Sequence, residues 1–198
     1  FRRVLFRSFL GENWATFEKL QKLEIDGAKE YREYSYLATL KELKSLKELS
    51  LLAYTTQNSL LSFFECFSLP PSIQKVELAI DNPEWDKVNV SGGENKSNFF
   101  EKKPVQKFFS LWEGLPNLKS LKIISTRLQK NYPTEVVYRI MNHVQNLEAF
   151  DLTWSNHGKD TDSIPELKFE LGILLQIIVK RSLKISDLNI NVPFMHYQ

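Results

Sequence analysis

The sequence predicts an α/β fold in which about six short parallel strands alternate with helices and form a sheet with one open face. Two observations carry this prediction. An apolar spacing, L-x-x-L-x-L with Ile, Val or Phe allowed, occurs six times along the chain. Segments with helical periodicity lie between the occurrences, and a parallel strand needs such a crossover before its next neighbour.

The six occurrences form a series, which is typical of a repeat rather than of chance leucines. They are LQKLEI (20–25), LKELSL (46–51), IQKVEL (73–78), LKSLKI (118–123), LEAFDL (147–152) and ISDLNI (185–190). The middle apolar residues, which we call the markers, are Leu23, Leu49, Val76, Leu121, Phe150 and Leu188. The markers are 26, 27, 45, 29 and 38 residues apart. Three of these steps are of similar length, at 26, 27 and 29 residues, and the other two are longer.

The end of each occurrence alternates apolar and polar residues, which predicts a short strand with one buried face. Charged residues occupy many of the alternate positions, among them Lys22, Glu24, Lys75 and Glu77. A doubly wound α/β domain is the alternative, but its strands are rich in Val and Ile and buried on both faces. The charged positions therefore favour a repeat array whose sheet is open on one side.

Five segments between the strands are predicted as helices, at 31–43, 58–67, 105–114, 134–144 and 166–182. The prolines of LPPS (69–72) end the second segment before the next strand, because proline cannot continue a helix. The most apolar run of the chain is LGILLQIIV (171–179). Because charged residues bracket this short run, it predicts a buried helix rather than a membrane span.

With this spacing and alternation, residues 14–192 resemble the leucine-rich repeat family in its intracellular, helix-bearing form. The resemblance implies a solenoid of about six repeats, with a curved parallel sheet on the concave side and helices on the convex side. It also implies a non-catalytic module that binds another protein in the cytoplasm. The chain departs from the family where many repeats place an asparagine after the strand, since those positions hold Gly27, Ala53, Ile80, Ser125 and Trp154.

The first eight residues, FRRVLFRS, resemble a translated sequencing adapter and are predicted to be non-native. A native basic arm is the alternative. The leucine-rich repeat domain then covers residues 9–198, a length that suits one domain, and we expect it to be a fragment. Without Arg2, Arg3 and Arg7 the chain has 23 basic and 24 acidic residues instead of 26 and 24. Its composition then gives no reason to expect nucleic-acid binding.

Two insertions lengthen the repeats, at 81–104 and 155–165. Both are rich in Gly, Pro, Asn, Asp and Ser, which predicts loops. Each follows a strand and precedes a helix, so both are expected at the same edge of the sheet. Trp85 and Trp154 lie in or beside these loops, and tryptophan is enriched at interfaces. The alternative is that Trp85 anchors its own loop and Trp154 caps the core.

The outward strand positions predict a partner-binding face with an apolar centre at Leu52, Ala79 and Ile124. The candidate partner-binding residues are Lys75, Glu77, Trp85, Lys122, Ile124, Asp151, Thr153 and Trp154. The charges on this face are mixed in sign and have no interleaved aromatic residues, which argues against nucleic acid as the partner. A solvated face without a partner is the alternative.

The sequence contains no motif that points to catalysis. SGGENKS (91–97) lacks the spacing of a phosphate-binding loop, and His143, His157 and His196 have no zinc-binding pattern. Cys66 is the only cysteine, so we expect a small buried residue in a reducing compartment. We therefore expect no enzyme activity, no catalytic, cofactor-binding or metal-binding residues, no small-molecule substrate and no membrane partner.

Three other functions stay open. The chain could be the substrate-recognition part of an F-box-like ubiquitin-ligase adaptor, which a helical F-box-like segment before residue 9 would indicate. It could be a GTPase-activating repeat protein, which would need catalytic polar residues at one edge of the repeats. It could also be an extracellular receptor segment, which a signal peptide and a cysteine-rich cap would indicate.

Overall fold

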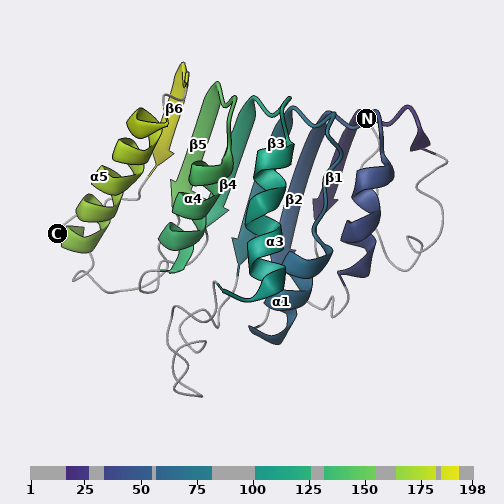
Figure 1. Ribbon diagram of the computed structural model, residues 1–198, viewed down its shortest axis with the longest axis horizontal. Helices are drawn as coiled ribbons and strands as arrows, with labels where there is room; N and C mark the ends of the chain where they lie inside the picture. Colours follow the sequence, from purple (N-terminus) through teal and green to yellow (C-terminus); the bar gives the residue numbers. More distant parts are fainter. Residues whose placement is uncertain are drawn as a thin grey trace.

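Six parallel strands form one sheet in a computed structural model of the chain, which describes residues 17–26, 34–54, 57–81, 101–125, 132–154, 164–181 and 184–191. The strands follow one another in sequence order, from β1 at one end to β6 at the other (Figure 1). Their bounds are Lys22–Asp26 (β1), Glu48–Tyr54 (β2), Lys75–Asp81 (β3), Ser120–Ser125 (β4), Ala149–Trp154 (β5) and Asp187–Asn191 (β6). The predicted α/β class and the predicted parallel strands are confirmed.

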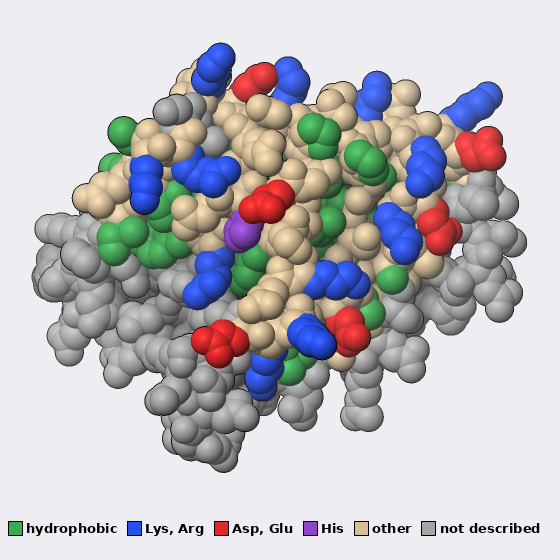
Figure 2. Space-filling view, viewed as in Figure 1, with side chains coloured by type: hydrophobic (Ala, Val, Ile, Leu, Met, Phe, Trp, Pro, Cys, Tyr) green, Lys and Arg blue, Asp and Glu red, His purple; other side chains and the backbone are tan. Residues whose placement is uncertain are grey.

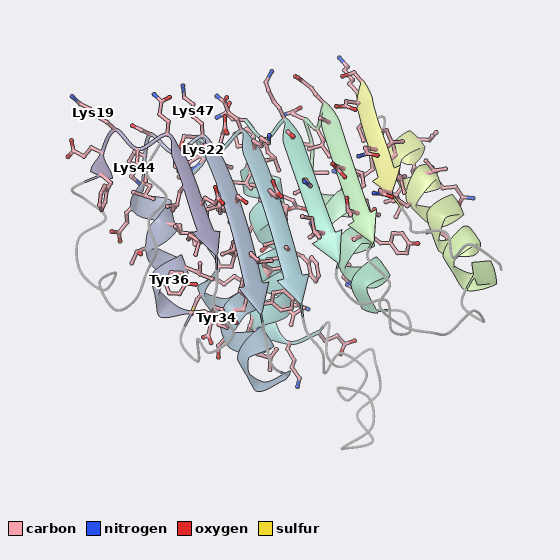
Figure 3. All side chains as sticks on the ribbon, turned by 180° about the vertical axis from the view of Figure 1, so that it is seen from behind. Lys19, Lys22, Tyr34, Tyr36, Lys44 and Lys47 are labelled. Carbon is pink, nitrogen blue, oxygen red and sulfur yellow. The ribbon has the colours of Figure 1, made fainter. Side chains whose placement is uncertain are left out.

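The described helices lie on one face of the sheet. Figure 1 shows them in front of the strands, and Figure 3 shows the strands in front when the molecule is seen from behind. The α-helices are Gln57–Cys66 (α1), Lys103–Leu111 (α3), Tyr132–His143 (α4) and Ile164–Lys180 (α5). The 3-10 helices are Ser35–Glu42 (η2) and Trp112–Gly114 (η4). This one-sided arrangement leaves the opposite face of the sheet without a described helix.

The segment between β1 and β2 forms a 3-10 helix at Ser35–Glu42, within the helix predicted at 31–43. The cause is visible in the spacing of its buried residues, since Tyr34, Leu37, Leu40 and Leu43 recur at every third position. A 3-10 helix has three residues per turn, so residues at this spacing lie above one another on one face. The tighter helix therefore turns all four side chains toward the sheet.

The markers lie side by side across the sheet. The register pairs Leu23 with Leu49, Leu49 with Val76, Val76 with Leu121, Leu121 with Phe150, and Phe150 with Leu188. A second row, two residues further along each strand, contains Ile25, Leu51, Leu78, Ile123, Leu152 and Ile190. In β1 to β5 the residues of both rows are buried. The alternating pattern therefore buries one face of every strand except the last.

The chain enters each strand through the same pair of backbone hydrogen bonds. The carbonyl of Gln21, two residues before its marker, accepts hydrogen bonds from the amides of Lys47 and Glu48, at 2.8 and 2.9 Å. The same arrangement recurs at the carbonyls of Lys47, Gln74, Lys119 and Glu148. Five equivalent steps therefore join the successive strands with the same offset.

Polar side chains link neighbouring repeats at the edge where the strands begin. The side-chain amide of Asn117 donates a hydrogen bond to the carbonyl of Pro71 at 2.9 Å, and Asn146 donates to the carbonyl of Pro116 at 3.0 Å. Ser72 occupies the equivalent place one repeat earlier and also donates to a carbonyl of the preceding repeat. These side chains give partners to backbone carbonyls that the turns leave outside the sheet.

Aromatic rings fill the space between α1, α3 and the sheet. Phe64 of α1 lies against Phe108 of α3, with ring centroids 4.4 Å apart. Phe67, just after α1, is 5.5 Å from Phe108 and 6.3 Å from Trp112. All four side chains are buried. Aromatic contacts of this kind contribute to stability beyond the area that they bury.

The α5 and β6 end of the fold is exposed where the rest is buried. The marker Leu188 is 43% exposed, while the marker Phe150 in the neighbouring strand is 1% exposed. In α5, Leu175 is 41% and Val179 76% exposed. The prediction that LGILLQIIV forms a buried helix is therefore wrong for these two residues. The reason is that α5 contacts a described helix, α4, on one side only, and no described helix follows β6.

The difference between the marker positions gives a test of the core. Leu121→Ala should lower the free energy of unfolding by about 2–5 kcal/mol, because it leaves a cavity in a fully buried site. Leu188→Ala is the matched control in the same row and should cost less than about 1 kcal/mol, because that side chain is already partly in water. Urea denaturation of both variants measures the difference. Equal losses would contradict the burial that the structure assigns to the markers.

Candidate functional site

The candidate site is the face of the sheet opposite to the helices, which we call the open face. Alternate residues of a strand point to opposite faces, so the positions between the buried rows belong to the open face. The register arranges them in three rows. The first row is Lys22, Glu48, Lys75, Ser120, Ala149 and Asp187, the second is Glu24, Ser50, Glu77, Lys122, Asp151 and Asn189, and the third is Asp26, Leu52, Ala79, Ile124, Thr153 and Asn191. Figure 3 shows this side of the sheet in front.

The second row places one lysine between two carboxylates. The ammonium nitrogen of Lys122 is 3.3 Å from a carboxylate oxygen of Glu77 on one side. Its register neighbour on the other side is Asp151, whose carboxylate accepts a hydrogen bond from the hydroxyl of Thr153 at 3.2 Å. Glu24 adds a third carboxylate to this row. Three acidic side chains and one lysine leave the row with two negative charges at neutral pH.

The first row has both signs of charge and is more exposed. Lys22 forms an ion pair with Glu48, with 3.9 Å between the nitrogen and the oxygen. Lys75 is exposed, and Asp187 is exposed at the far end of the row. Because both partners of the Lys22 pair are about half exposed, water screens their attraction and the pair contributes little to stability. This ion pair is therefore not needed to hold the sheet together.

The third row contains an apolar strip on three neighbouring strands. The strip consists of Leu52 on β2, Ala79 on β3 and Ile124 on β4, which are register partners. Leu52 and Ile124 are partly exposed, and the small Ala79 between them is buried. The strip lies near the ends of the strands and borders the charged second row. An apolar centre with charged surroundings is the arrangement that protein interfaces use.

The structure brings six of the eight candidate residues together on β3, β4 and β5. Lys75, Glu77, Lys122, Ile124, Asp151 and Thr153 occupy neighbouring positions in the three rows. Trp154 ends β5 beside Ser125, one position beyond the third row, and Trp85 lies outside the described residues. Leu52 and Ala79 complete the apolar strip although the candidate set contains only Ile124. The same alternation that selects Ile124 is the signal for both.

The two insertions leave the sheet at the edge next to the apolar strip. The expected loop 81–104 starts within β3, which includes Asp81, and ends within α3, which begins at Lys103. The expected loop 155–165 follows β5 and ends within α5, which begins at Ile164. Residues 82–100 and 155–163 lie outside the described residues. Because β3 and β5 are parallel, both insertions follow strands that end at the same edge.

The residues with possible chemical roles are engaged in packing. Burial raises the pKa of the Cys66 thiol, the negative charge of Glu65 raises it further, and Lys107 partly opposes this. A raised pKa keeps the thiol protonated at neutral pH, so Cys66 is a poor nucleophile. His143 contacts Glu113 at 2.7 Å and stacks on Phe109, which joins α4 to the preceding helices. Within the described ranges no three His, Cys, Asp or Glu side chains are grouped as metal ligands.

Comparisons with known proteins identify no relative, so a function can be argued only from the geometry of this chain. No protein-family model, no curated protein and no solved structure matches this chain. In the part of the chain that the structure describes, no helix has the length and apolar character needed to cross a membrane.

The Lys122–Glu77 pair tests whether the open face is solvated. A double-mutant cycle with Lys122→Ala and Glu77→Ala should give a coupling of about 0.2–1 kcal/mol, because both side chains are about one-third exposed. The coupling should fall in about 1 M salt, which screens exposed charges. The more exposed Lys119–Glu148 pair is the control and should couple no more strongly. Urea denaturation provides the measurement, and a coupling well above about 2 kcal/mol would show a buried pair instead.

Proposed function

We propose that this chain is a non-catalytic protein–protein interaction module of the leucine-rich repeat type, and that its partner binds on the open face. The observation that carries the proposal is the one-sided sheet, in which sequential strands have described helices on one face only. A doubly wound domain reverses its strand order and places helices on both faces. Sequential order with one covered face instead supports a solenoid of stacked repeats.

The chemistry of the open face indicates the kind of partner that it would accept. The apolar strip of Leu52, Ala79 and Ile124 offers a place for an apolar side chain. The second row beside it has an excess of negative charge around Glu77 and Asp151. A partner segment with an apolar residue next to basic residues would therefore match the face, since complementary charge favours the correct partner.

The proposal includes the edge of the open face where the insertions begin. Trp85 and Trp154 belong to or adjoin these insertions, and large aromatic residues often anchor interfaces. We place the module in the cytoplasm, because Cys66 is a free thiol and such residues suit a reducing compartment. No catalytic step is part of the proposal.

A charge introduced into the apolar strip tests the proposed function. Ile124→Arg should reduce partner binding at least about tenfold, because it places a charge where the partner would bury an apolar side chain. The matched control is Gln106→Arg, an exposed position of α3 on the helix-covered side. Both variants and the original chain are immobilised and incubated with the same extract of the source organism, and the bound proteins are quantified by mass spectrometry.

The proposal requires a set of bound proteins that the original chain and Gln106→Arg share and Ile124→Arg loses. Thermal melts by circular dichroism check that both variants keep the fold. If folded Ile124→Arg binds the same set, or if Gln106→Arg alone loses it, the open face is not the binding surface.

A further inference from the structure

The character of the open face changes along the strands, from the edge where they begin to the edge where they end. On β3 the three open-face residues are, in order, Lys75, Glu77 and Ala79. They belong to the first, second and third rows, and neighbouring rows are about 6.6 Å apart because they are two strand residues apart. A basic, an acidic and an apolar position thus follow one another within about 13 Å of one strand.

Lysines gather at the edge where β1, β2 and β3 begin. We call Lys22, Lys44, Lys47 and Lys75 the lysine edge, and all four are exposed. Figure 3 shows the first three near the starts of β1 and β2. Figure 2 shows Lys and Arg side chains projecting along the same edge when the molecule is seen from the helix-covered side. The edge is therefore accessible from the open face and from the rim of the sheet.

The lysine edge has an excess of positive charge. Glu48 is the carboxylate of the first row between these lysines, and it is 3.9 Å from the ammonium of Lys22. Among the described residues, no carboxylate lies within ion-pair distance of Lys47 or Lys75. Four lysines and one glutamate leave three positive charges at neutral pH. Two sequence neighbours of opposite charge on each side leave this excess unchanged, namely Glu18 with Lys19 and Lys41 with Glu42.

The second row has the opposite excess. The ammonium of Lys122 is 3.3 Å from Glu77, and its other register neighbour is Asp151, so the one lysine of this row already lies between two carboxylates. The sign of the charge therefore reverses within one row spacing of the lysine edge. The apolar strip in the third row follows at the next spacing. A partner that lies along the strands meets positive charge, negative charge and an apolar surface in that order.

These features fit a protein segment better than a nucleic acid. Surfaces that bind nucleic acids combine basic residues with aromatic side chains for stacking, and arginine supplies a fork for phosphate groups. The lysine edge contains only lysines, and the three rows of the open face contain no aromatic residue. The acidic second row would also repel a phosphate backbone that crossed the face. Carboxylates of a protein segment are the better match for the lysine edge.

We propose that the open face binds an extended protein segment along β2 and β3, with an acidic side chain at the lysine edge, a basic one at Glu77 and an apolar one at the apolar strip. Alternate side chains of an extended segment lie on one side at the same spacing as the rows. Residues i, i+4 and i+8 of an α-helix have a similar rise but turn by about 40° at each step, so the third would leave the face. This inference rests on the proposed function, because it specifies the partner of the same surface.

The order of the charges gives the face its selectivity. A segment with the acidic and basic residues exchanged would bring like charges together at the lysine edge and again at Glu77, and such contacts are strongly unfavourable. Both chain directions of the segment satisfy the order. The expected pattern is therefore acidic-x-basic-x-apolar or its reverse, where x points to solvent.

Peptide selection on the full chain tests the proposal. Random peptides of about twelve residues, long enough to span the three rows, are displayed on phage and enriched on the immobilised chain. Enriched peptides should contain an acidic, a basic and an apolar residue at alternate positions in this order. The dissociation constants of the enriched peptides are then measured by fluorescence anisotropy.

Charge reversals locate the bound peptide. Lys75→Glu should raise the dissociation constant at least about fivefold, because it brings two carboxylates together. Lys107→Glu is the matched control, which changes an exposed lysine of α3 on the helix-covered side and should leave the affinity unchanged. A peptide whose acidic residue is replaced by lysine should bind Lys75→Glu more tightly than it binds the original chain. Thermal melts check that all variants are folded.

The outcomes separate this inference from the proposed function. If Ile124→Arg abolishes peptide binding while Lys75→Glu and Lys107→Glu bind alike, or if the enriched peptides lack the alternating order, the inference is wrong and the proposed binding face stands. If Ile124→Arg leaves peptide binding unchanged, or if no peptide is enriched, both are wrong.

Discussion

The architecture depends on one backbone constraint, the pair of hydrogen bonds through which each strand is joined to the strand before it. The carbonyl of Gln74, for example, accepts hydrogen bonds from the amides of Lys119 and Ser120 across the longest step between two markers. This step sets the register, and the register decides which face every side chain takes. A slip of one residue would turn Leu121 to the open face and Lys122 into the core. The burial of the marker row stabilises only one register.

The same constraint produces the surface that we propose for binding. Because the helices cover the marker side, the residues between the markers form rows on the other side of the sheet. The second row brings Glu77, Lys122 and Asp151 together from three strands, and the third row brings together the apolar strip. A short local pattern, repeated in register, thus creates an extended surface that no single repeat has.

The sequence predicted the strands well because alternation and spacing are local properties. The alternating positions at the end of each occurrence, such as Leu121 and Ile123 in LKSLKI, lie within the observed strands. The contact between Lys122 and Glu77 is harder to predict, because it depends on the alignment of β4 with β3. That alignment depends on the conformation of the long insertion between the two strands. The three-residue spacing of the apolar residues in η2 is the local signal that distinguishes a 3-10 helix from an α-helix.

The exposure of the last repeat shows where a local pattern stops being informative. Leu188 has the same sequence context as Phe150, but burial depends on whether another element packs beside it. The apolar run in α5 likewise predicts a helix and cannot say how many neighbours the helix has. The sequence of one repeat thus encodes its secondary structure and the face of the sheet to which each side chain points. Burial at the end of the sheet depends instead on which elements pack beside it.

Amide hydrogen exchange at Lys119 and Ser120 tests the central claim most directly, because both amides share the carbonyl of Gln74 across the longest step. The account predicts that both amides exchange at least about a thousandfold more slowly than in an unfolded peptide, since opening them requires separating β3 from β4. Exchange of both amides at the rate of an unfolded peptide, in a chain that is otherwise folded, would contradict the register on which the open face depends.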